Sequence, residues 1–339
     1  MLDSLWIVLI AFIISLGLTP LAAQLAHRVN MLDKPDNKLK RHAKPIPYLG
    51  GLAVYFAWLL PLITIKIWQH GKLFGIIGIL TGATLIVVLG IIDDKYKLSP
   101  LIKFIGQILA ALVLIICHMR LQFIDSFFWS SWLTVFWVVG ITNAMNLIDI
   151  MDGLASGVSI IAIGVFFILA VEQGRINDMY ILAALGGGLL GFIPYNFPRA
   201  RIYLGDTGAL LIGFVLAALA VGGEYSDYNN LAIITPILIL TVPIFDTLFI
   251  IFIRYRRGVP IFRGSPDHIA LRLVKLGFSR VQTVGLLWLV SILLGIIAYF
   301  TTKISLQWSV LVYVIIGVVL FFVGIYMGDS KLEGNSSKK

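Results

Sequence analysis

The sequence predicts an all-α, polytopic integral membrane protein, and three observations support this prediction. Of the 339 residues, 59% are hydrophobic and 13% are charged, whereas charged residues make up about 25% of a typical soluble domain. The mean hydropathy is +0.98. The apolar residues also come in runs of roughly 17 to 25, the length that a helix needs to cross a bilayer. We therefore expect a bundle of spanning helices.

Eleven runs qualify as spans, and ten is the alternative count because the fifth and eighth runs are the weakest. The expected spans are roughly residues 4–26, 48–66, 73–92, 100–118, 127–143, 154–171, 179–196, 208–223, 230–253, 281–300 and 306–327. Residues 1–329 are expected to form one transmembrane catalytic domain, followed by a disordered cytoplasmic tail, 330–339. The single cysteine, Cys117, excludes an internal disulfide.

Lysine and arginine residues are distributed unevenly between the two sides of this bundle. With eleven spans, 21 of the 26 basic residues fall on one side and 5 on the other. Because cytoplasmic loops carry the excess of positive charge, the N-terminus is expected outside and the C-terminus in the cytoplasm. This orientation, together with attraction to anionic lipid or substrate, explains the net charge of +9 without a nucleic-acid partner.

Every polar cluster that resembles a chemical site falls in a predicted cytoplasmic segment. These segments are residues 33–51, 93–103, 143–153, 194–208 and 254–280. Such a one-sided arrangement favours an enzyme at the membrane face over a transporter, which would be expected to carry a charged site near the bilayer midplane.

Two adjacent carboxylates, Asp93 and Asp94, end the third apolar run. Neighbouring carboxylates repel each other unless a cation or several hydrogen-bond donors lie beside them. A divalent metal ion is one solution, and phosphate chemistry is a common reason for it. The alternative is an acidic, solvated helix end.

The segment NAMNLIDIMDG places Asn143, Asn146, Asp149 and Asp152 at every third position. In a helix or a 3₁₀ turn these residues share one broad face. Amide and carboxylate groups of this kind can bind a nucleobase or ribose, or hold a metal ion through water. The alternative is a capping and turn sequence between two helices.

The segment RIYLGDTG places Asp206 between two glycines, just before another apolar run. Glycines let the backbone approach closely, and a following helix N-terminus can bind phosphate, so Asp206 suits a metal ligand. Helix capping is the alternative interpretation. Tyr203 is placed to stack on a base or to lie at the membrane interface.

Basic residues elsewhere suit anionic ligands. Lys44 precedes the PIPYLGG turn, Lys103 begins the fourth span, and Arg263 lies near His268 in the last cytoplasmic loop. For each basic residue the alternative is that its positive charge only keeps its segment on the cytoplasmic side of the membrane. Asp246, within the ninth run, is expected to face the bundle interior. The pattern HIALRLVKLG predicts a short amphipathic segment.

Taken together, six ordered motifs resemble the polyprenyl-phosphate N-acetylhexosamine-1-phosphate transferases (glycosyltransferase family 4). The motifs are DKPDNKLKRHAKPIPYLGG, GIIDDKYKLSP, NAMNLIDIMDGLASG, RIYLGDTGALLIGF, PIFD and DHIALRL, and they extend over nearly the whole chain. The GlcNAc-1-phosphate branch is the nearest. This resemblance implies Mg²⁺-dependent (alternatively Mn²⁺-dependent) transfer of a sugar 1-phosphate from a UDP-sugar to undecaprenyl phosphate, with release of UMP, at the cytoplasmic face of a bacterial inner membrane.

The resemblance also implies roles for individual residues. Asp206 would ligate Mg²⁺, and Asp93 would deprotonate the lipid phosphate with Asp94 beside it. Lys103 would meet the lipid phosphate and His268 the diphosphate. Asn146, Asp149 and Asp152 would hold the nucleoside and support the metal site, and Tyr203 would flank the uracil. The product would start an envelope polysaccharide such as lipopolysaccharide or teichoic acid.

Two departures from the family pattern bear on the sugar donor. Ala270 and Leu271 stand where two further histidines are common, and Tyr48 stands where an arginine is common. The alternatives are therefore another UDP-N-acetyl sugar or UDP-MurNAc-pentapeptide as donor, a non-catalytic relative, or, from another class, a lipid-phosphate or nucleotide-sugar transporter. The sequence does not fix the oligomeric state, and a homodimer is kept as an expectation.

Overall fold

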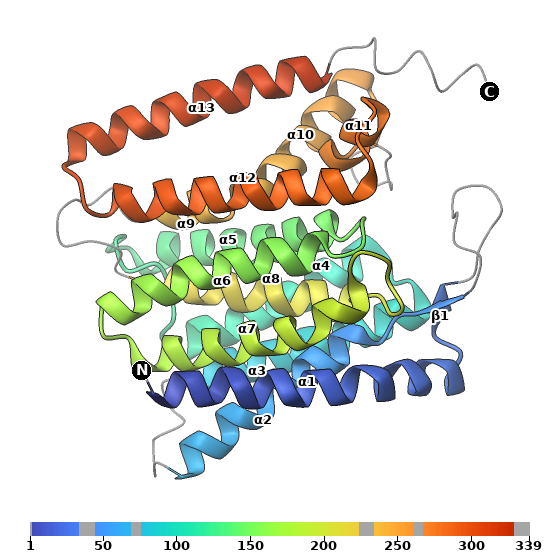
Figure 1. The fold of residues 1–339 in the computed structure, drawn as a ribbon. Coiled ribbons are helices and arrows are strands. Elements are labelled where there is room, and N and C mark those ends of the chain that lie inside the picture. The colour runs from blue at the N-terminus through green and yellow to red at the C-terminus, as the bar shows by residue number, and fades with distance from the viewer. Residues whose placement is uncertain (1, 34–44, 69–75, 224–233, 261–266, 329–339) are drawn as a thin grey trace. The chain divides into compact units, whose positions relative to one another are not determined.

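The computed structural model describes residues 2–33, 45–68, 76–223, 234–260 and 267–328, in which thirteen helices and one short two-stranded sheet lie (Figure 1). In this sheet β1 (Leu32–Asp33) pairs antiparallel with β2 (Ile46–Pro47). The chain divides into two compact units, Met1–Gly223 and Glu224–Lys339. Each unit is described by itself.

The described residues of the first unit form eight helices. These are α1 (Leu2–Arg28), α2 (Gly50–Trp68), α3 (Ile77–Tyr96), α4 (Pro100–Ile116), α5 (Phe127–Ile148), α6 (Leu154–Glu172), α7 (Ile176–Asn196) and α8 (Gly205–Val221). Those of the second unit form five: α9 (Thr235–Ile239), α10 (Thr241–Arg257), α11 (Ile269–Lys275), α12 (Arg280–Thr301) and α13 (Leu306–Gly328).

The all-helical membrane architecture is confirmed. Within the described residues, seven helices are long and apolar enough to cross a membrane, and α2, α4 and α8 are shorter apolar helices. A helix lies in each of the eleven predicted ranges. The exact number of spans and the orientation of the termini stay predictions, as does the single catalytic domain. The predicted tail lies outside the described residues.

The expected span at 230–253 is divided within its described part. Residues 234–253 contain two helices, α9 and α10, which meet at Leu240. Pro243 has no N–H to donate to the carbonyl of Ile239 four residues earlier, so the helical hydrogen-bond ladder is interrupted where α9 ends. The predicted amphipathic segment is present as α11.

Helix α8 is the centre of the first unit. All but one of its residues are buried, and it packs against α2, α3 and α5. A helix that is apolar on all sides is expected to be enclosed by others. Glycines permit this packing, because a Cβ on Gly51 of α2 or on Gly90 of α3 would collide with the backbone of Gly208 or Thr207. The N-terminus of α8 therefore lies at backbone contact with both neighbours.

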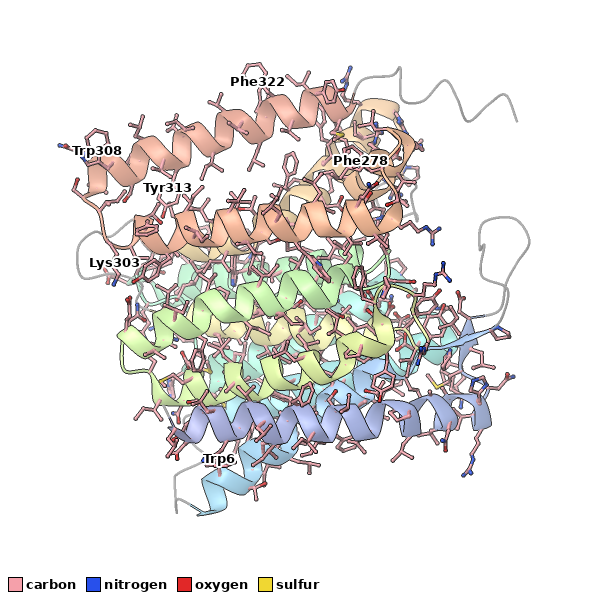
Figure 2. All side chains as sticks on the ribbon, in the orientation of Figure 1. Trp6, Phe278, Lys303, Trp308, Tyr313 and Phe322 are labelled. Carbon is pink, nitrogen blue, oxygen red and sulfur yellow. The ribbon has the colours of Figure 1, made fainter. Side chains whose placement is uncertain are left out.

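The second unit has a small core at one end of its helices. Phe249, Ile253, Ile269, Leu273 and Met327 bring together α10, α11 and α13. Elsewhere α13 exposes apolar side chains, and Figure 2 labels Trp308 and Phe322, each 62% exposed, among them. Exposed apolar surface of this extent on a long apolar helix is typical of contact with lipid.

Candidate functional site

Asp93 and Lys103 are brought together by a tight connection between α3 and α4. Lys97 takes a left-handed conformation with φ of 54° and ends α3, and its N–H donates to the carbonyl of Asp93 at 2.8 Å. Ser99 then caps α4, with Pro100 as its first residue, both typical of a helix start. The last turn of α3 and the first turn of α4 therefore share one end of the unit.

Lys103 forms ion pairs with two carboxylates from different helices. Its Nζ binds Asp93 Oδ2 and, at 2.6 Å, Asp206 Oδ2 at the start of α8. The other Asp93 oxygen accepts a hydrogen bond from the N–H of Leu98 at 2.7 Å. Asp93 is almost fully buried, whereas the Lys103 and Asp206 side chains are 21% and 29% exposed. This acidic cluster, Asp93, Lys103 and Asp206, is thus open to a ligand on the Lys103–Asp206 side.

Asp94 has a different environment from its neighbour. Its Oδ1 accepts from the N–H of Asp206 at 2.9 Å, and its Oδ2 accepts from the N–H and the hydroxyl of Thr207 at 3.1 and 2.6 Å. Asp94 therefore caps α8 from another helix. Gly205, with φ of 72°, leaves room for it, since a Cβ there would lie 2.8 Å from the Asp94 carboxylate. The structure uses both Asp94 oxygens to hold Asp206 in place.

The predicted polar face of residues 143–152 is divided between a helix and a turn. Helix α5 ends at Ile148, so Asp149 and Asp152 lie in the connection to α6. The amide of Asn143 exchanges hydrogen bonds with Gln107 of α4, at 2.5 and 3.3 Å. Asn143 thus joins two helices. Sequence reasoning missed Gln107, which the structure buries fully. The available signal in the sequence was an amide side chain inside an apolar run.

Asp152 and Asn196 hold the loop that leads to α8. Asp152 Oδ2 accepts from the N–H of Ala200 at 2.9 Å. Asn196, which is buried and was missed, accepts from the N–H of Gly153 at 2.9 Å and donates to the carbonyl of Ile202 at 3.1 Å. These bonds fix residues 197–204 against the α5–α6 turn, and so fix the position of Tyr203.

Tyr203 pairs with Tyr48 beside this loop. The two rings are 5.8 Å apart and tilted, and Lys97 Nζ lies 4.9 Å from the centre of the Tyr48 ring. The N–H of Tyr203 donates to the carbonyl of Pro47, and the Tyr48 hydroxyl donates to Asp33 at 2.8 Å. Burial, and then this bond to Asp33, raise the pKa of Tyr48. Tyr48 is therefore fixed where the family commonly has arginine.

The carboxylates near α8 fit a hard cation. Within the described residues, no three His, Cys, Asp or Glu side chains form a ready-made metal site. Mg²⁺ nevertheless needs only one or two protein carboxylates in addition to substrate phosphates. Burial, followed by the charges of Asp206, Asp94 and Asp152, raises the pKa of Asp149 to about 8. Like charges gathered in this way favour a bound cation, and the carboxylates of Asp206 and Asp149 are of the oxygen type that Mg²⁺ takes.

The second unit holds a separate buried polar cluster. His268 Nδ1 lies 2.7 Å from Asp246 Oδ2, and Asp267 is held by Arg257 at 3.0 Å and Arg272 at 3.1 Å. Arg272 also donates to the carbonyl of Met327 and lies over the Phe249 ring. The prediction that Asp246 faces the interior is confirmed, since it is 5% exposed.

Three further residues were predicted to belong to the site: Lys44, Asn146 and Arg263. Lys44 and Arg263 lie outside the described residues. Asn146 lies in the last turn of α5.

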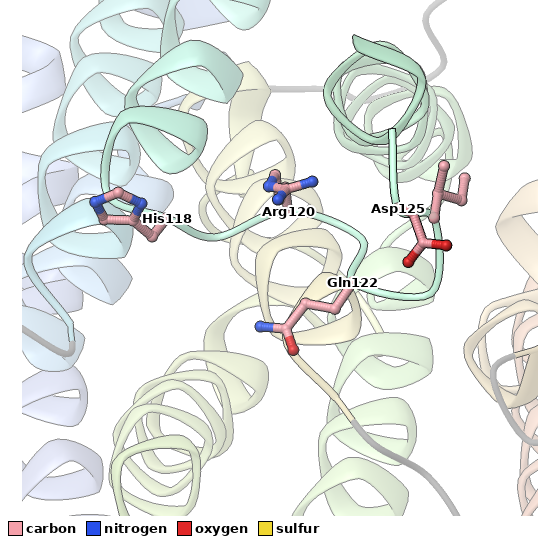
Figure 3. A pocket seen from close by; sticks show the side chains of 5 residues that line it. His118, Arg120, Gln122 and Asp125 are labelled. Atoms are coloured by element: carbon pink, nitrogen blue, oxygen red, sulfur yellow. The ribbon is translucent and has the colours of Figure 1, made fainter. Parts of the chain in front are cut away.

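A polar pocket between α4 and α5 is lined by His118, Arg120, Gln122, Ile124 and Asp125 (Figure 3). It lies at the opposite end of α4 from Lys103, about 20 Å away at the helical rise of 1.5 Å per residue, and so is separate from the acidic cluster.

Comparisons with known proteins find relatives that match most of the chain. The model of "Glycosyl transferase family 4" matches residues 76–224, which include the acidic cluster. A probable undecaprenyl-phosphate N-acetylglucosaminyl 1-phosphate transferase of Bacillus subtilis is 36% identical over 88% of this chain and 86% of its own. A decaprenyl-phosphate N-acetylglucosaminephosphotransferase of Mycobacterium leprae is 32% identical over 86% of this chain and 81% of its own. A phospho-N-acetylmuramoyl-pentapeptide-transferase of Limosilactobacillus fermentum is 31% identical over 74% of this chain and 81% of its own.

Proposed function

Because the chain belongs to glycosyl transferase family 4, we propose that it transfers N-acetylglucosamine 1-phosphate from UDP-N-acetylglucosamine to undecaprenyl phosphate. The products are a lipid diphosphate sugar and UMP. The observation that carries the proposal is the pair of carboxylates, Asp93 and Asp206, that share Lys103 at the common end of α3, α4 and α8. The named activities of the relatives in Bacillus subtilis and Mycobacterium leprae support the same reaction.

The reaction requires charge neutralisation and alignment more than covalent chemistry. An oxygen of the lipid phosphate attacks the sugar-bearing phosphorus of the donor, and the bond from that phosphorus to the bridging oxygen breaks. UMP leaves with the electron pair of that bond. Asp93 accepts the remaining proton of the lipid phosphate, while the Lys103 ammonium offsets the negative charge of both substrates.

Mg²⁺ is part of the proposal. When bound at Asp206 and Asp149, it would neutralise diphosphate charge as a Lewis acid. The chain's own contribution there is positional: Asp94 fixes the start of α8, and Asp152 with Asn196 fixes the loop before it. The Tyr48–Tyr203 pair offers an aromatic surface for the uracil ring.

The orientation also belongs to the proposal. The excess of Lys and Arg on one side supports a cytoplasmic active site in a bacterial multi-pass membrane protein. Both substrates are anionic, and the second, a polyprenyl phosphate, is a membrane lipid. A cluster at the ends of apolar helices suits such a pair of substrates. A homodimer stays an untested prediction.

UMP release by the purified protein tests the function. The assay contains undecaprenyl phosphate, Mg²⁺ and one donor at a time: UDP-GlcNAc, other UDP-N-acetyl sugars or UDP-MurNAc-pentapeptide. We expect UMP only with UDP-GlcNAc, and only when lipid and metal ion are both present. UMP from UDP-MurNAc-pentapeptide alone would correct the donor, which the relative in Limosilactobacillus fermentum makes a necessary arm. Folded protein that releases no UMP from any donor would refute the reaction.

A further inference from the structure

The polar pocket of Figure 3 lies at the start of α5, a helix long and apolar enough to cross a membrane. Its volume is about 360 Å³, within the range of about 300–1,000 Å³ that is typical of sites for small ligands. The first residues of α5 are aromatic, and Phe127, Trp129 and Trp132 are each more than half exposed. Exposed aromatic side chains at the end of a spanning helix are typical of the membrane–water interface. The pocket therefore lies at the level of the lipid headgroups.

The backbone around the pocket is fixed by contacts within the fold. His118 takes a left-handed conformation with φ of 62° just after α4 ends. The N–H of Leu121 donates to Thr134 Oγ1 at 3.0 Å, and Ser130 Oγ donates to the carbonyl of Leu121. Thr134 and Ser130 are both fully buried on α5. The connection that lines the pocket is thus anchored to a spanning helix.

The polar side chains of the pocket are not used by the fold. His118, Arg120, Gln122 and Asp125 contribute an imidazole, a guanidinium, an amide and a carboxylate. In the part of the chain that the structure describes, none of these four side chains makes a hydrogen bond or an ion pair. The Arg120 guanidinium lies 5.1 Å from the centre of the Phe127 ring, a contact that orients the group and leaves its N–H donors free. The pocket therefore offers a cation and an anion to a ligand.

A second arginine of the first unit shows the contacts of a structural role. Arg175 pairs with Asp178 and donates to the carbonyl of Leu219 at 3.4 Å, so it joins the start of α7 to the end of α8. Arg120 makes no such link between helices, although Asp125 lines the same pocket. The two charges of the pocket are thus available for binding rather than for holding helices together.

We propose that the pocket binds the headgroup of an aminophospholipid, a membrane lipid that carries a phosphate diester and a primary ammonium, such as phosphatidylethanolamine. Arg120, the amide of Gln122 and an N–H of His118 donate hydrogen bonds to the phosphate oxygens. The Asp125 carboxylate accepts hydrogen bonds from the ammonium. The site is independent of the proposed reaction, because the pocket lies at the opposite end of α4 from Lys103.

The charges of the pocket discriminate between lipid classes. The headgroup of phosphatidylglycerol pairs with Arg120 but brings its negative charge close to Asp125 without an ammonium to offset it. The quaternary ammonium of phosphatidylcholine has no N–H to donate to Asp125. A headgroup with both a phosphate and a primary ammonium pairs with each charge. The exposed Phe127 and Trp129 next to the pocket supply apolar surface for the acyl chains.

Lipid binding to the full chain tests the proposal. Phosphatidylethanolamine, phosphatidylglycerol and phosphatidylcholine with identical acyl chains are titrated one at a time into the delipidated protein in detergent, and bound lipid is counted by native mass spectrometry. The wild type should bind phosphatidylethanolamine about 2- to 5-fold more tightly than either other lipid, the effect of one partly exposed ionic contact. Asp125→Asn should lower the affinity for phosphatidylethanolamine to that for phosphatidylglycerol. Arg120→Met should weaken the binding of both.

Two control variants remove the same kinds of charge elsewhere. Arg256→Met removes an arginine whose guanidinium also lies over an aromatic ring, that of Phe252 at 5.7 Å. Asp3→Asn removes a carboxylate from the first turn of α1. Both controls should keep the lipid preference of the wild type. A wild type that binds the three lipids equally, or a preference that survives both Arg120→Met and Asp125→Asn, overturns the inference.

Two further arms keep the test decisive. If a charged variant unfolds at a lower temperature without lipid, Gln122→Leu replaces it, because it removes a donor to the phosphate without changing a charge. It should weaken the binding of phosphatidylethanolamine and phosphatidylglycerol alike, and unchanged binding contradicts the proposal. Glycerophosphoethanolamine has the same headgroup without acyl chains and should not displace the lipid at equal concentration. Displacement would assign the pocket to a soluble zwitterion and overturn the lipid assignment.

Discussion

The two polar clusters of the molecule are each built on a pair of adjacent polar residues. In the first unit the pair is Asp93–Asp94, and in the second it is Asp267–His268. One member of each pair is fully bonded to the fold: Asp94 caps α8, and Asp267 is held by two arginines. The other member pairs with one ionisable side chain of another segment: Asp93 with Lys103, and His268 with Asp246. Adjacent polar residues therefore need not share a role.

The clusters differ in how the remaining member of each pair, Asp93 or His268, is held. Asp93 pairs with Lys103, which also binds Asp206 and is 21% exposed. His268 pairs with Asp246, which is buried and serves no other side chain in the described part of the unit. A shared, partly exposed ammonium can move toward a substrate phosphate, whereas a dedicated buried carboxylate holds one ring orientation. The first arrangement suits a reaction centre and the second suits a fixed contact.

The largest effect that separates the members of a pair is expected for Asp93→Asn. Loss of a general base lowers kcat by about 10²- to 10⁴-fold, while donor binding should be retained because the proposed nucleotide contacts, Asp149, Asp152 and Tyr203, lie on other segments. UMP release and the equilibrium binding of UDP-GlcNAc measure the two quantities. Asp3→Asn, in the first turn of α1, is the control for loss of an aspartate charge. If donor binding disappears together with turnover, the role of Asp93 as base loses its support.

Lys103→Met tests whether the shared ammonium is needed. The change leaves Asp93 and Asp206 next to each other without their common cation, and should lower kcat by about 10²- to 10³-fold. Lys103→Arg keeps the charge but not the geometry, and is expected to retain part of the activity. The readout is UMP release at several Mg²⁺ concentrations. Near-normal turnover of Lys103→Met would show that Lys103 only neutralises the cluster.

A smaller effect is expected when Asp94 loses one of its bonds. Thr207→Val removes the hydroxyl that donates to Asp94 Oδ2 at 2.6 Å and keeps the side-chain volume. A hydrogen bond to a charged group contributes about 1.5–3 kcal/mol, so the free energy of unfolding should fall by that amount, with Thr207→Ser close to the wild type. Unfolding followed by tryptophan fluorescence gives this value. Activity should fall less than in Asp93→Asn; an equal loss would mean that Asp94 also takes part in the chemistry.

Much of the fold could be predicted because membrane spans are read from composition. Runs of apolar residues predicted a helix in every expected range. The division of the ninth range at Leu240 follows from Pro243, which an apolar run does not reveal. The sequence also singled out the residues of the acidic cluster, since charges beside long apolar runs are costly without a purpose. The importance of Gly51 and Gly90 was not visible, because it depends on which helices touch α8.

The division of labour within the site could not be predicted. Asp93 and Asp94 are chemically identical neighbours in the sequence, and only the packing of α8 against α3 determines which one is used as a cap. In the same way, the spacing of Asn143, Asn146, Asp149 and Asp152 suggested one face. The chain leaves the helix at Ile148, and Asn143 pairs with a residue 36 positions earlier. Contacts distant in sequence decide these roles.

The smallest effect should come from a polar pair outside both clusters. Gln107→Leu removes the amide that exchanges hydrogen bonds with Asn143, while Asn143 keeps its bond to the Val139 carbonyl at 2.8 Å. Hydrogen bonds between helices in a membrane contribute about 0.6 kcal/mol on average, so stability should fall by roughly that amount. UMP release should be unchanged, because the pair joins α4 to α5 and touches no residue of the acidic cluster. Asn143→Leu and the double variant complete a double-mutant cycle that isolates the pair. A marked loss of turnover in Gln107→Leu, at unchanged stability, would mean that Asn143 belongs to the substrate site after all, and that a polar residue bonded within the fold can still take part in binding.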